Sequence, residues 1–166
     1  RCGVENVTVV KTQELPDGNF PTCPYPNPEI RQAFEEALKV AKEVKPDILL
    51  ATDPDCDRVG IAVEKDGDYK LMTGNEVGVM LLNYILSQKK ANSTLPENPV
   101  AVKTIVSSEL ARKIADKYSC KLIDVLTGFK FIGEQIKLLE EKGRDDDFVL
   151  GFEESYGYLA GSYVRD

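Results

Sequence analysis

Three aspartates stand at alternate positions in the segment Asp-Pro-Asp-Cys-Asp-Arg, which occupies residues 53–58. So dense a cluster of carboxylates repels itself in a tight loop unless a cation neutralises it. The chain contains no histidine, and carboxylate oxygens suit a hard ion such as Mg²⁺, which takes its other ligands from water or a phosphate. We therefore expect Asp53, Asp55 and Asp57 to bind a divalent cation. Arg58 adds a fixed positive charge suited to a second anion such as a phosphate.

Three other interpretations of this acidic loop stay open. The first is a solvated acidic turn. The second is an EF-hand calcium loop, in which Glu64 would complete the set of acids, but Arg58 stands where the sharp turn needs glycine and residues 59–63 have the pattern of a strand. The third is an aspartyl-nucleophile phosphatase with Asp53 as nucleophile, although Asp57 stands where the motif Asp-x-Asp-x-Thr has threonine.

The composition limits the classes of function. At 166 residues, 42% hydrophobic and 30% charged, the chain resembles an ordinary soluble protein of one domain or two small ones. It has no apolar run long enough for a membrane span and no signal-like N-terminus. The net charge of −7 without a basic stripe argues against nucleic-acid binding. The four cysteines form no Cys-x-x-Cys pair, which favours reduced thiols of a cytoplasmic protein.

The order of apolar runs predicts two α/β units. In the first we expect a strand, a proline-rich connector, a helix, a buried strand and a hairpin, over residues 4–10, 17–28, 28–45, 48–51 and 59–72. The helix would begin at Pro28 and end before Pro46. Its buried face would contain Ala33, Phe34, Ala37, Leu38 and Ala41. The acidic loop then follows the carboxyl end of a buried strand, where ligands of open α/β sheets gather.

The second unit is expected to begin with a helix capped by Thr73 or Asn75. The apolar positions of this helix are Val77, Met80, Leu81, Tyr84 and Ile85. Further strands are expected over 100–106, 121–126 and 148–151, and further helices from 107–109 and over 131–141. The whole pattern predicts two consecutive three-layer α/β units with mixed, mostly parallel sheets, divided into residues 1–72 and 73–166.

Two loops of the second unit carry polar side chains directly after predicted strands. Thr127, Gly128 and Lys130 offer a hydroxyl, a flexible backbone and a cation at the start of a helix, a position suited to an anion. A plain Thr-Gly turn is the alternative. Glu153 and Ser155 place a carboxylate beside a hydroxyl, which suits the binding of sugar hydroxyls. A solvated turn is the alternative there.

Together these loops resemble those of one family. An Asp-x-Asp-x-Asp-Arg loop, a Thr-Gly-aromatic-Lys turn and a Glu-Glu-Ser loop, in this order, are similar to the α-D-phosphohexomutases, and most similar to the bacterial phosphoglucomutases. The connector at 16–21 and 26–29 and the segment Gly-Phe-Glu-Glu-Ser-Tyr-Gly at 151–157 resemble the same family. The resemblance covers essentially the whole chain. It implies most of the second and third of four domains that surround a cleft.

The resemblance implies a role for each loop. The three aspartates would bind Mg²⁺, and Arg58 would act in catalysis by steadying a phosphate or the glucose 1,6-bisphosphate intermediate. Lys130 would also be catalytic. The substrate-binding residues that the resemblance implies are Thr127, Gly128, Lys130, Glu153, Ser155 and Lys103.

The implied reaction is the interconversion of glucose 1-phosphate and glucose 6-phosphate through a phosphoserine. The family's phosphoserine loop contains a histidine and this chain has none, so we expect that loop to lie outside the chain and both domains to be truncated. The chain alone is then expected to be inactive and to self-associate through apolar surface exposed by truncation. A phosphomannomutase, an aspartyl-nucleophile phosphatase and a non-enzymatic calcium-binding module are the alternatives.

Overall fold

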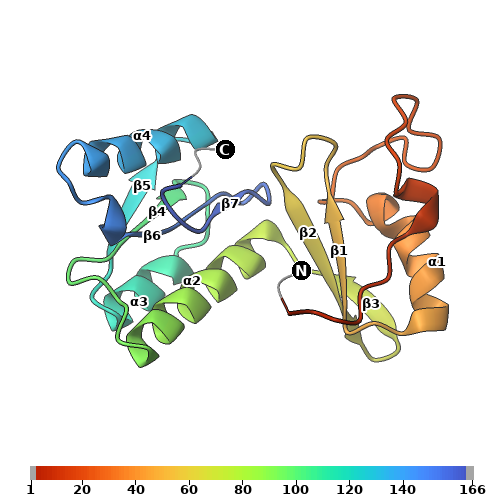
Figure 1. Ribbon diagram of the computed structural model, residues 1–166, viewed down its shortest axis with the longest axis horizontal. Coiled ribbons are helices and arrows are strands. Elements are labelled where there is room, and N and C mark those ends of the chain that lie inside the picture. The colour runs from red at the N-terminus through yellow and green to blue at the C-terminus, as the bar shows by residue number, and fades with distance from the viewer. Residues whose placement is uncertain (1–2, 164–166) are drawn as a thin grey trace. The chain divides into compact units, whose positions relative to one another are not determined.

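The computed structural model describes residues 3–163 and divides the chain into two compact units, Arg1–Met72 and Thr73–Asp166 (Figure 1). Each unit has its own sheet, with strand order β1-β2-β3 in the first and β5-β4-β6-β7 in the second. Both sheets are packed against helices, so the predicted α/β class is confirmed. Among residues 3–163, no helix is both long enough and apolar enough to cross a membrane.

The first unit is a three-stranded antiparallel sheet with one covering helix. Its strands are β1 (Ile48–Thr52), β2 (Val59–Lys65) and β3 (Asp68–Leu71). The 3₁₀ turns η1 (Lys11–Gln13) and η2 (Arg31–Phe34) precede helix α1 (Glu35–Val44). The buried core joins helix and sheet through Phe34, Ala37, Ala41, Leu49 and Ala62, which confirms the predicted helical face.

The helix begins later than predicted. Pro28 does not open it but lies buried in the connector, so close to β2 that a Cβ on Gly60 would lie 2.7 Å from the Pro28 Cβ. A tight turn follows, in which the Asn27 side chain accepts from the Glu29 amide at 2.9 Å and the Asn27 carbonyl accepts from the Ile30 amide at 3.2 Å. This local hydrogen bonding competes with helix formation until η2.

The strand predicted over residues 4–10 is wrong. Residues 4–10 are irregular, and Val4, Val7 and Val9 are 60%, 69% and 47% exposed. A β-branched run becomes a strand only when a neighbouring strand accepts its backbone hydrogen bonds. No strand within residues 3–163 pairs with this run.

Residues 48–51 form the predicted strand, but the prediction that this strand is buried is wrong. β1 is the edge strand of its sheet, and its side chains alternate, with Leu49 7% exposed but Ile48 46% and Leu50 65%. Successive strand residues point to opposite faces, and α1 covers only one of them. A continuous apolar run in the sequence does not show whether one face of the sheet is exposed to solvent.

The second unit has three layers. Strands β4 (Val100–Thr104), β5 (Lys121–Val125) and β6 (Phe148–Phe152) are parallel, and the short, unpredicted β7 (Tyr158–Leu159) pairs antiparallel with β6. Helices α2 (Gly74–Ala91) and α3 (Leu110–Lys117) cover one face and α4 (Phe129–Glu140) the other, with η3 (Asp145–Asp147) before β6 (Figure 1). Ala101 belongs to the core under α2 and α3, and Val100 and Val102 to the core under α4.

Helix α2 starts as predicted but buries a different face. Thr73 caps it in a reciprocal capping box with Glu76. Met80 and Tyr84, two of the apolar positions named for this helix, are 53% and 62% exposed. The buried residues are Gly74, Val77, Gly78, Val79, Leu82 and Leu86. Apolar side chains occur around much of this helix, and Gly78 decides which face approaches the sheet, because a Cβ there would lie 2.3 Å from the Phe152 ring.

Candidate functional site

The acidic loop joins β1 to β2 and brings its three carboxylates together. One carboxylate oxygen from each of Asp53, Asp55 and Asp57 lies within 4.8 Å of the others. The turn closes because Cys56 adopts a left-handed backbone conformation, with φ +63°, and its amide donates to the Asp53 carbonyl at 3.2 Å. The structure therefore brings together the three predicted metal ligands.

The electrostatics of the loop fit a hard cation. A hydrogen bond with Asp53, partial burial and the charges of Asp53 and Asp55 raise the pKa of Asp57 to about 6. Burial raises the pKa of Asp53, but hydrogen bonds from Asp57 and from the Arg58 backbone outweigh it and hold that pKa below its ordinary value. The loop thus crowds three carboxylates into a site that offers only oxygen ligands. A divalent cation such as Mg²⁺ would relieve their repulsion.

Arg58 is tied to the acidic loop while its side chain remains 38% exposed. Its amide donates to Asp53 Oδ1 at 3.0 Å. Its guanidinium donates to Glu29 Oε1 at 3.2 Å and lies 3.7 Å from Asp53 Oδ2 and 3.8 Å from Asp57 Oδ1. Glu29, which the sequence did not suggest, therefore helps to hold the guanidinium where an additional anion can reach it.

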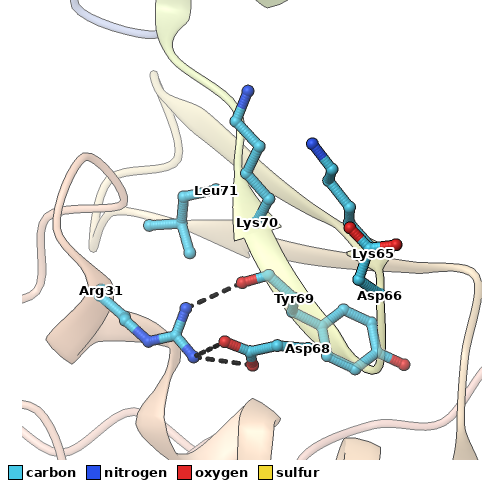
Figure 2. A pocket seen from close by; sticks show the side chains of 7 residues that line it. All are labelled: Arg31, Lys65, Asp66, Asp68, Tyr69, Lys70 and Leu71. Atoms are coloured by element: carbon cyan, nitrogen blue, oxygen red, sulfur yellow. Dashed lines mark hydrogen bonds and ion pairs between the residues drawn. The ribbon is translucent and has the colours of Figure 1, made fainter.

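A separate hollow of about 380 Å³ lies beside the β2–β3 hairpin. Figure 2 shows Arg31 reaching across it, with its guanidinium paired to both oxygens of Asp68 and to the Tyr69 carbonyl. The contacts are 2.8–3.1 Å long. They fasten η2 to the hairpin. The hollow contains none of the predicted site residues.

In the second unit, the loops after β4, β5 and β6 meet at one edge of the sheet, because the carboxyl ends of parallel strands lie together. Glu153, only 6% exposed, joins two of them. Its Oε1 accepts from the Gly128 amide at 2.6 Å and its Oε2 from the Ser155 hydroxyl at 3.2 Å. The Thr-Gly turn and the Glu-Glu-Ser loop, predicted separately, thus form one cluster.

The remaining residues of the Thr-Gly turn face solvent. Gly128 has φ +125° and ψ 129°, a conformation that only glycine adopts readily. Thr127 and Lys130 are exposed at the beginning of α4. The Lys130 ammonium lies 4.8 Å from the centre of the Phe131 ring. The turn therefore displays a hydroxyl and a cation next to the Glu153 carboxylate.

Lys103 lies in a buried position below the loop after β4. Its side chain is 0% exposed, and its Nζ contacts the Thr104 and Ser107 carbonyls at 3.3 and 3.2 Å, Glu109 at 2.9 Å and Asp124 at 3.1 Å. The ammonium is therefore fully occupied by the chain itself in this structure. The one hint of this in the sequence is a single lysine within the otherwise uncharged strand Val-Ala-Val-Lys-Thr.

An ion-pair network continues outward from Lys103. Arg112 forms ion pairs with both Glu109 and Asp124, the same two acids that contact Lys103. Hydrogen bonds from the two cations, Lys103 first, hold the pKa of Glu109 below its ordinary value. Burial raises the pKa of Asp124, but hydrogen bonds from Lys103 and Arg112 outweigh it. Glu109 and Arg112 are three residues apart, but nothing in the sequence indicated that Lys103 and Asp124 would join them.

A third contact at this edge was not predicted from the sequence. Glu154 Oε2 accepts from the Thr104 hydroxyl at 2.7 Å and lies 3.4 Å from the Ser107 hydroxyl. The two hydroxyls are 2.7 Å apart. The acids of the Glu-Glu-Ser loop therefore engage different neighbours, Glu153 the loop after β5 and Glu154 the loop after β4.

Comparison with known proteins places this architecture in one family. Residues 1–67 match the profile described as phosphoglucomutase/phosphomannomutase, alpha/beta/alpha domain II, and residues 73–166 match that of domain III. A phosphoglucomutase of Staphylococcus saprophyticus is 41% identical over 165 residues, which cover 97% of this chain and 29% of the relative. The chain spans less than a third of the curated relatives that it matches.

Two solved structures share the fold. A phosphoglucomutase/phosphomannomutase family protein from Burkholderia thailandensis aligns with a TM-score of 0.64 at 18% identity, over 87% of this chain and 28% of that one. N-acetylphosphoglucosamine mutase of Aspergillus fumigatus, solved with GlcNAc-6P and magnesium, aligns with a TM-score of 0.50 at 16% identity, over 68% of this chain and 22% of that one. The chain belongs to the phosphoglucomutase/phosphomannomutase family.

Proposed function

We propose that this chain supplies the magnesium-binding and sugar-binding domains of a phosphoglucomutase, which interconverts glucose 1-phosphate and glucose 6-phosphate. The observation that carries the proposal is the pair of loop clusters within one chain: three crowded carboxylates in one unit and a fixed carboxylate beside a hydroxyl in the other. The relative that is 41% identical is named phosphoglucomutase. The phosphoserine is proposed to lie outside these 166 residues.

For the acidic loop, we propose that Asp53, Asp55 and Asp57 hold Mg²⁺. The Aspergillus structural relative was solved with magnesium, and the crowding of three carboxylates in the loop supports a cation here. Mg²⁺, when bound, neutralises charge on a phosphoryl group during transfer. Arg58 is then the residue that can pair with a further phosphate oxygen, including one of glucose 1,6-bisphosphate, because its guanidinium keeps exposed surface beside the loop.

For the second unit, we propose that Glu153 and Ser155 bind sugar hydroxyls and that Thr127, Gly128 and Lys130 contribute from the adjoining turn. A carboxylate can accept several hydrogen bonds, so Glu153 retains acceptor capacity beyond its two internal donors. Lys130 is exposed and able to reach an anion. Lys103 as a substrate ligand stays a prediction, and contact with a phosphate would require its ammonium to exchange one of its present partners.

The test is kinetic and uses the intact enzyme that contains this chain. We expect turnover of glucose 1-phosphate with higher kcat/KM than mannose 1-phosphate, with stimulation by glucose 1,6-bisphosphate. The two sugars differ only at C2, where each hydroxyl contact contributes about 1–3 kcal/mol. A higher kcat/KM for mannose 1-phosphate would assign the protein to phosphomannomutases instead.

The chain alone is expected to lack mutase activity, and this separates the proposal from a phosphatase. An aspartyl-nucleophile phosphatase would hydrolyse a phosphate ester unaided, with Asp53 as nucleophile. Phosphatase turnover by the 166-residue chain that disappears in Asp53→Asn would overturn the mutase proposal. The cytoplasmic location expected from the sequence stays a prediction.

Self-association of the isolated chain is a further expectation. Ile48 and Leu50 leave apolar surface on the open face of the first sheet, and such surface favours association. Light scattering should show concentration-dependent oligomers that Leu50→Lys weakens. Leu15→Lys, at an 82% exposed residue outside the sheet, is the matched control. A strictly monomeric chain at high concentration would contradict the expectation.

A further inference from the structure

Glu154 is attached to the loop after β4 by a chain of hydroxyl groups. Thr104 has one hydroxyl proton and donates it to Glu154 Oε2 at 2.7 Å. The Ser107 hydroxyl, 2.7 Å from the Thr104 oxygen, can then donate to that oxygen and so continue the chain. This order, Ser107 to Thr104 to Glu154, uses both protons in the two shortest contacts. It makes Thr104 the central member.

The hydroxyl chain is shielded from water. Thr104 is 0% exposed and Ser107 4%. A hydrogen bond to a carboxylate is stronger than one between neutral groups, and low exposure strengthens it further. Glu153 and Ser155 do not supply other donors to this carboxylate, because the Ser155 hydroxyl and the Gly128 amide both donate to Glu153. Glu154 is therefore the side chain that anchors its loop to the loop after β4.

Lys103 supports the other end of the anchor. Its buried ammonium donates to the carbonyls of both Thr104 and Ser107. These are the two residues whose hydroxyls form the chain to Glu154. The lysine thereby fixes the backbone that carries the donors, and Asp124 and Glu109 fix the lysine. Strand ends of β4, β5 and β6 are connected by this single set of contacts.

The backbone of Glu154 is held as tightly as its side chain. A Cβ on Gly74 would lie 2.0 Å from the Glu154 carbonyl oxygen, so the first residue of α2 packs directly on this peptide. The turn closes through the Glu153 amide, which donates to the Gly157 carbonyl at 3.0 Å, and Tyr156 adopts φ +71° within it. A non-glycine residue in that conformation persists only where its surroundings impose it.

We propose that Glu154 is a positioning residue for the sugar-binding loop. Its carboxylate, held by Thr104 and Ser107, fixes the peptide between Glu153 and Ser155, so that both side chains are presented to the sugar without first having to be ordered. This inference rests on the proposed function of Glu153 and Ser155 as sugar ligands. It adds a role for Glu154, Thr104 and Ser107 to the proposed sugar ligands.

The first test measures hydrogen–deuterium exchange of the 166-residue chain. Thr104→Val keeps the shape of the side chain and removes its hydroxyl, whereas Thr104→Ser keeps the hydroxyl. We expect exchange at residues 153–157 to accelerate by roughly tenfold or more in the valine variant, the equivalent of one charge-assisted hydrogen bond, and to recover in the serine variant. Thr94→Val, at an exposed threonine in the loop after α2, is the matched control.

The second test measures steady-state kinetics of Thr104→Val and Glu154→Gln in the intact enzyme. Loss of preorganisation should raise KM for glucose 1-phosphate by roughly tenfold while kcat changes much less. Glu154→Gln, which keeps an acceptor oxygen but no charge, should fall between wild type and Thr104→Val. Glu134→Gln on the exposed face of α4 is the control.

Two results would overturn the inference. One is unchanged exchange at 153–157 in Thr104→Val. The other is an equal acceleration throughout β4, β5 and β6, which would assign the hydroxyl chain to general stability. An intact wild-type enzyme that converted neither sugar phosphate would refute the proposed function instead. The exchange measurement would still decide whether Glu154 orders residues 153–157.

Discussion

The carboxylates of the two units have opposite surroundings. In the acidic loop, Asp53, Asp55 and Asp57 have mainly one another and Arg58 as neighbours, and the pKa of Asp57 rises to about 6. In the second unit, Glu153 and Glu154 each accept hydrogen bonds from amide or hydroxyl donors of the chain. The carboxylates of the first cluster repel one another, whereas those of the second have donors within the chain.

This difference matches what each cluster is proposed to bind. A divalent ion requires concentrated negative charge, and the repulsion among the empty ligands adds to the driving force for binding. A sugar presents neutral hydroxyl groups, which are bound best by acceptors already held in place. The predictions below test whether the two clusters differ in this way, from the largest expected effect to the smallest.

The largest effect is expected from Asp55→Ala, because this substitution removes one charged ligand from the proposed metal site in the acidic loop. The affinity of the chain for Mn²⁺, used as a spectroscopic substitute for Mg²⁺, should fall by at least about tenfold. Asp47→Ala, at an exposed acid just before β1, is the control. Equal Mn²⁺ binding by the wild type and Asp55→Ala would remove the metal site. A strong preference for Ca²⁺ would favour the calcium-binding alternative.

Gly74→Ala should disturb the second cluster by steric overlap alone. The new Cβ would lie 2.0 Å from the Glu154 carbonyl oxygen, and neither backbone can yield without moving α2 or the loop. We expect the free energy of unfolding of the second unit to fall by about 1–3 kcal/mol in urea titrations. Gly18→Ala, where a Cβ would meet nothing within 4 Å, should change stability by less than about 0.5 kcal/mol. Similar losses in both variants would refute the close packing.

Lys103→Met tests whether the second unit depends on its internal ion pairs. The loss of the ammonium removes a buried donor from the Thr104 and Ser107 carbonyls and from two acids that keep Arg112 as a partner. We expect the free energy of unfolding to fall by about 1–3 kcal/mol at pH 7. Urea titration measures it. Lys113→Met, at an exposed lysine of α3, is the control and should have little effect.

The same variant should change the acid response. The pKa values of Asp124 and Glu109 lie below their ordinary values of 3.8 and 4.5 in the folded protein. Their ion pairs therefore contribute stability that is fully present when the pH is above the ordinary pKa values. This stability is lost as the pH falls through the lowered pKa values of the folded protein. Between pH 5 and pH 2, stability of the second unit should fall less steeply in Lys103→Met than in wild type. Parallel curves would contradict the assignment.

The last comparison concerns two cysteines and requires no substitution. Burial raises the pKa of the Cys120 thiol to about 11, whereas Cys56 is exposed in the acidic loop. Alkylation by iodoacetamide at pH 8, followed by peptide mass spectrometry, should label Cys56 faster than Cys120 by roughly a hundredfold or more. Comparable rates would indicate that the core beneath α2 and α3 opens easily.

Features that depend on neighbouring residues could be predicted from the sequence. The spacing of Asp53, Asp55 and Asp57 within one tight loop brings their carboxylates together whatever the rest of the chain does. The capping box of Thr73 and Glu76 lies within a single helical turn. The helical face containing Phe34, Ala37 and Ala41 follows from the 3.6-residue period.

Features that depend on partners far away in the sequence could not be predicted. Residues 4–10 have the composition of a strand, but a strand exists only where another edge pairs with it. β1 is apolar throughout, yet α1 covers one of its faces. Met80 and Tyr84 fit a helical stripe, yet the packing of Gly78 on Phe152 turned another face of α2 to the core.

The candidate site also combines features set by neighbouring residues with contacts between distant ones. Its residue types, its order of loops and the acidic loop itself are properties of the sequence, because they involve positions a few residues apart. The contact of Glu153 with Gly128 spans 25 residues and that of Glu154 with Thr104 spans 50. Only the parallel arrangement of β5, β4 and β6 brings these positions to one edge. Hydrogen bonds depend on distances of about 3 Å, and no spacing along a chain fixes such a distance between residues on different strands.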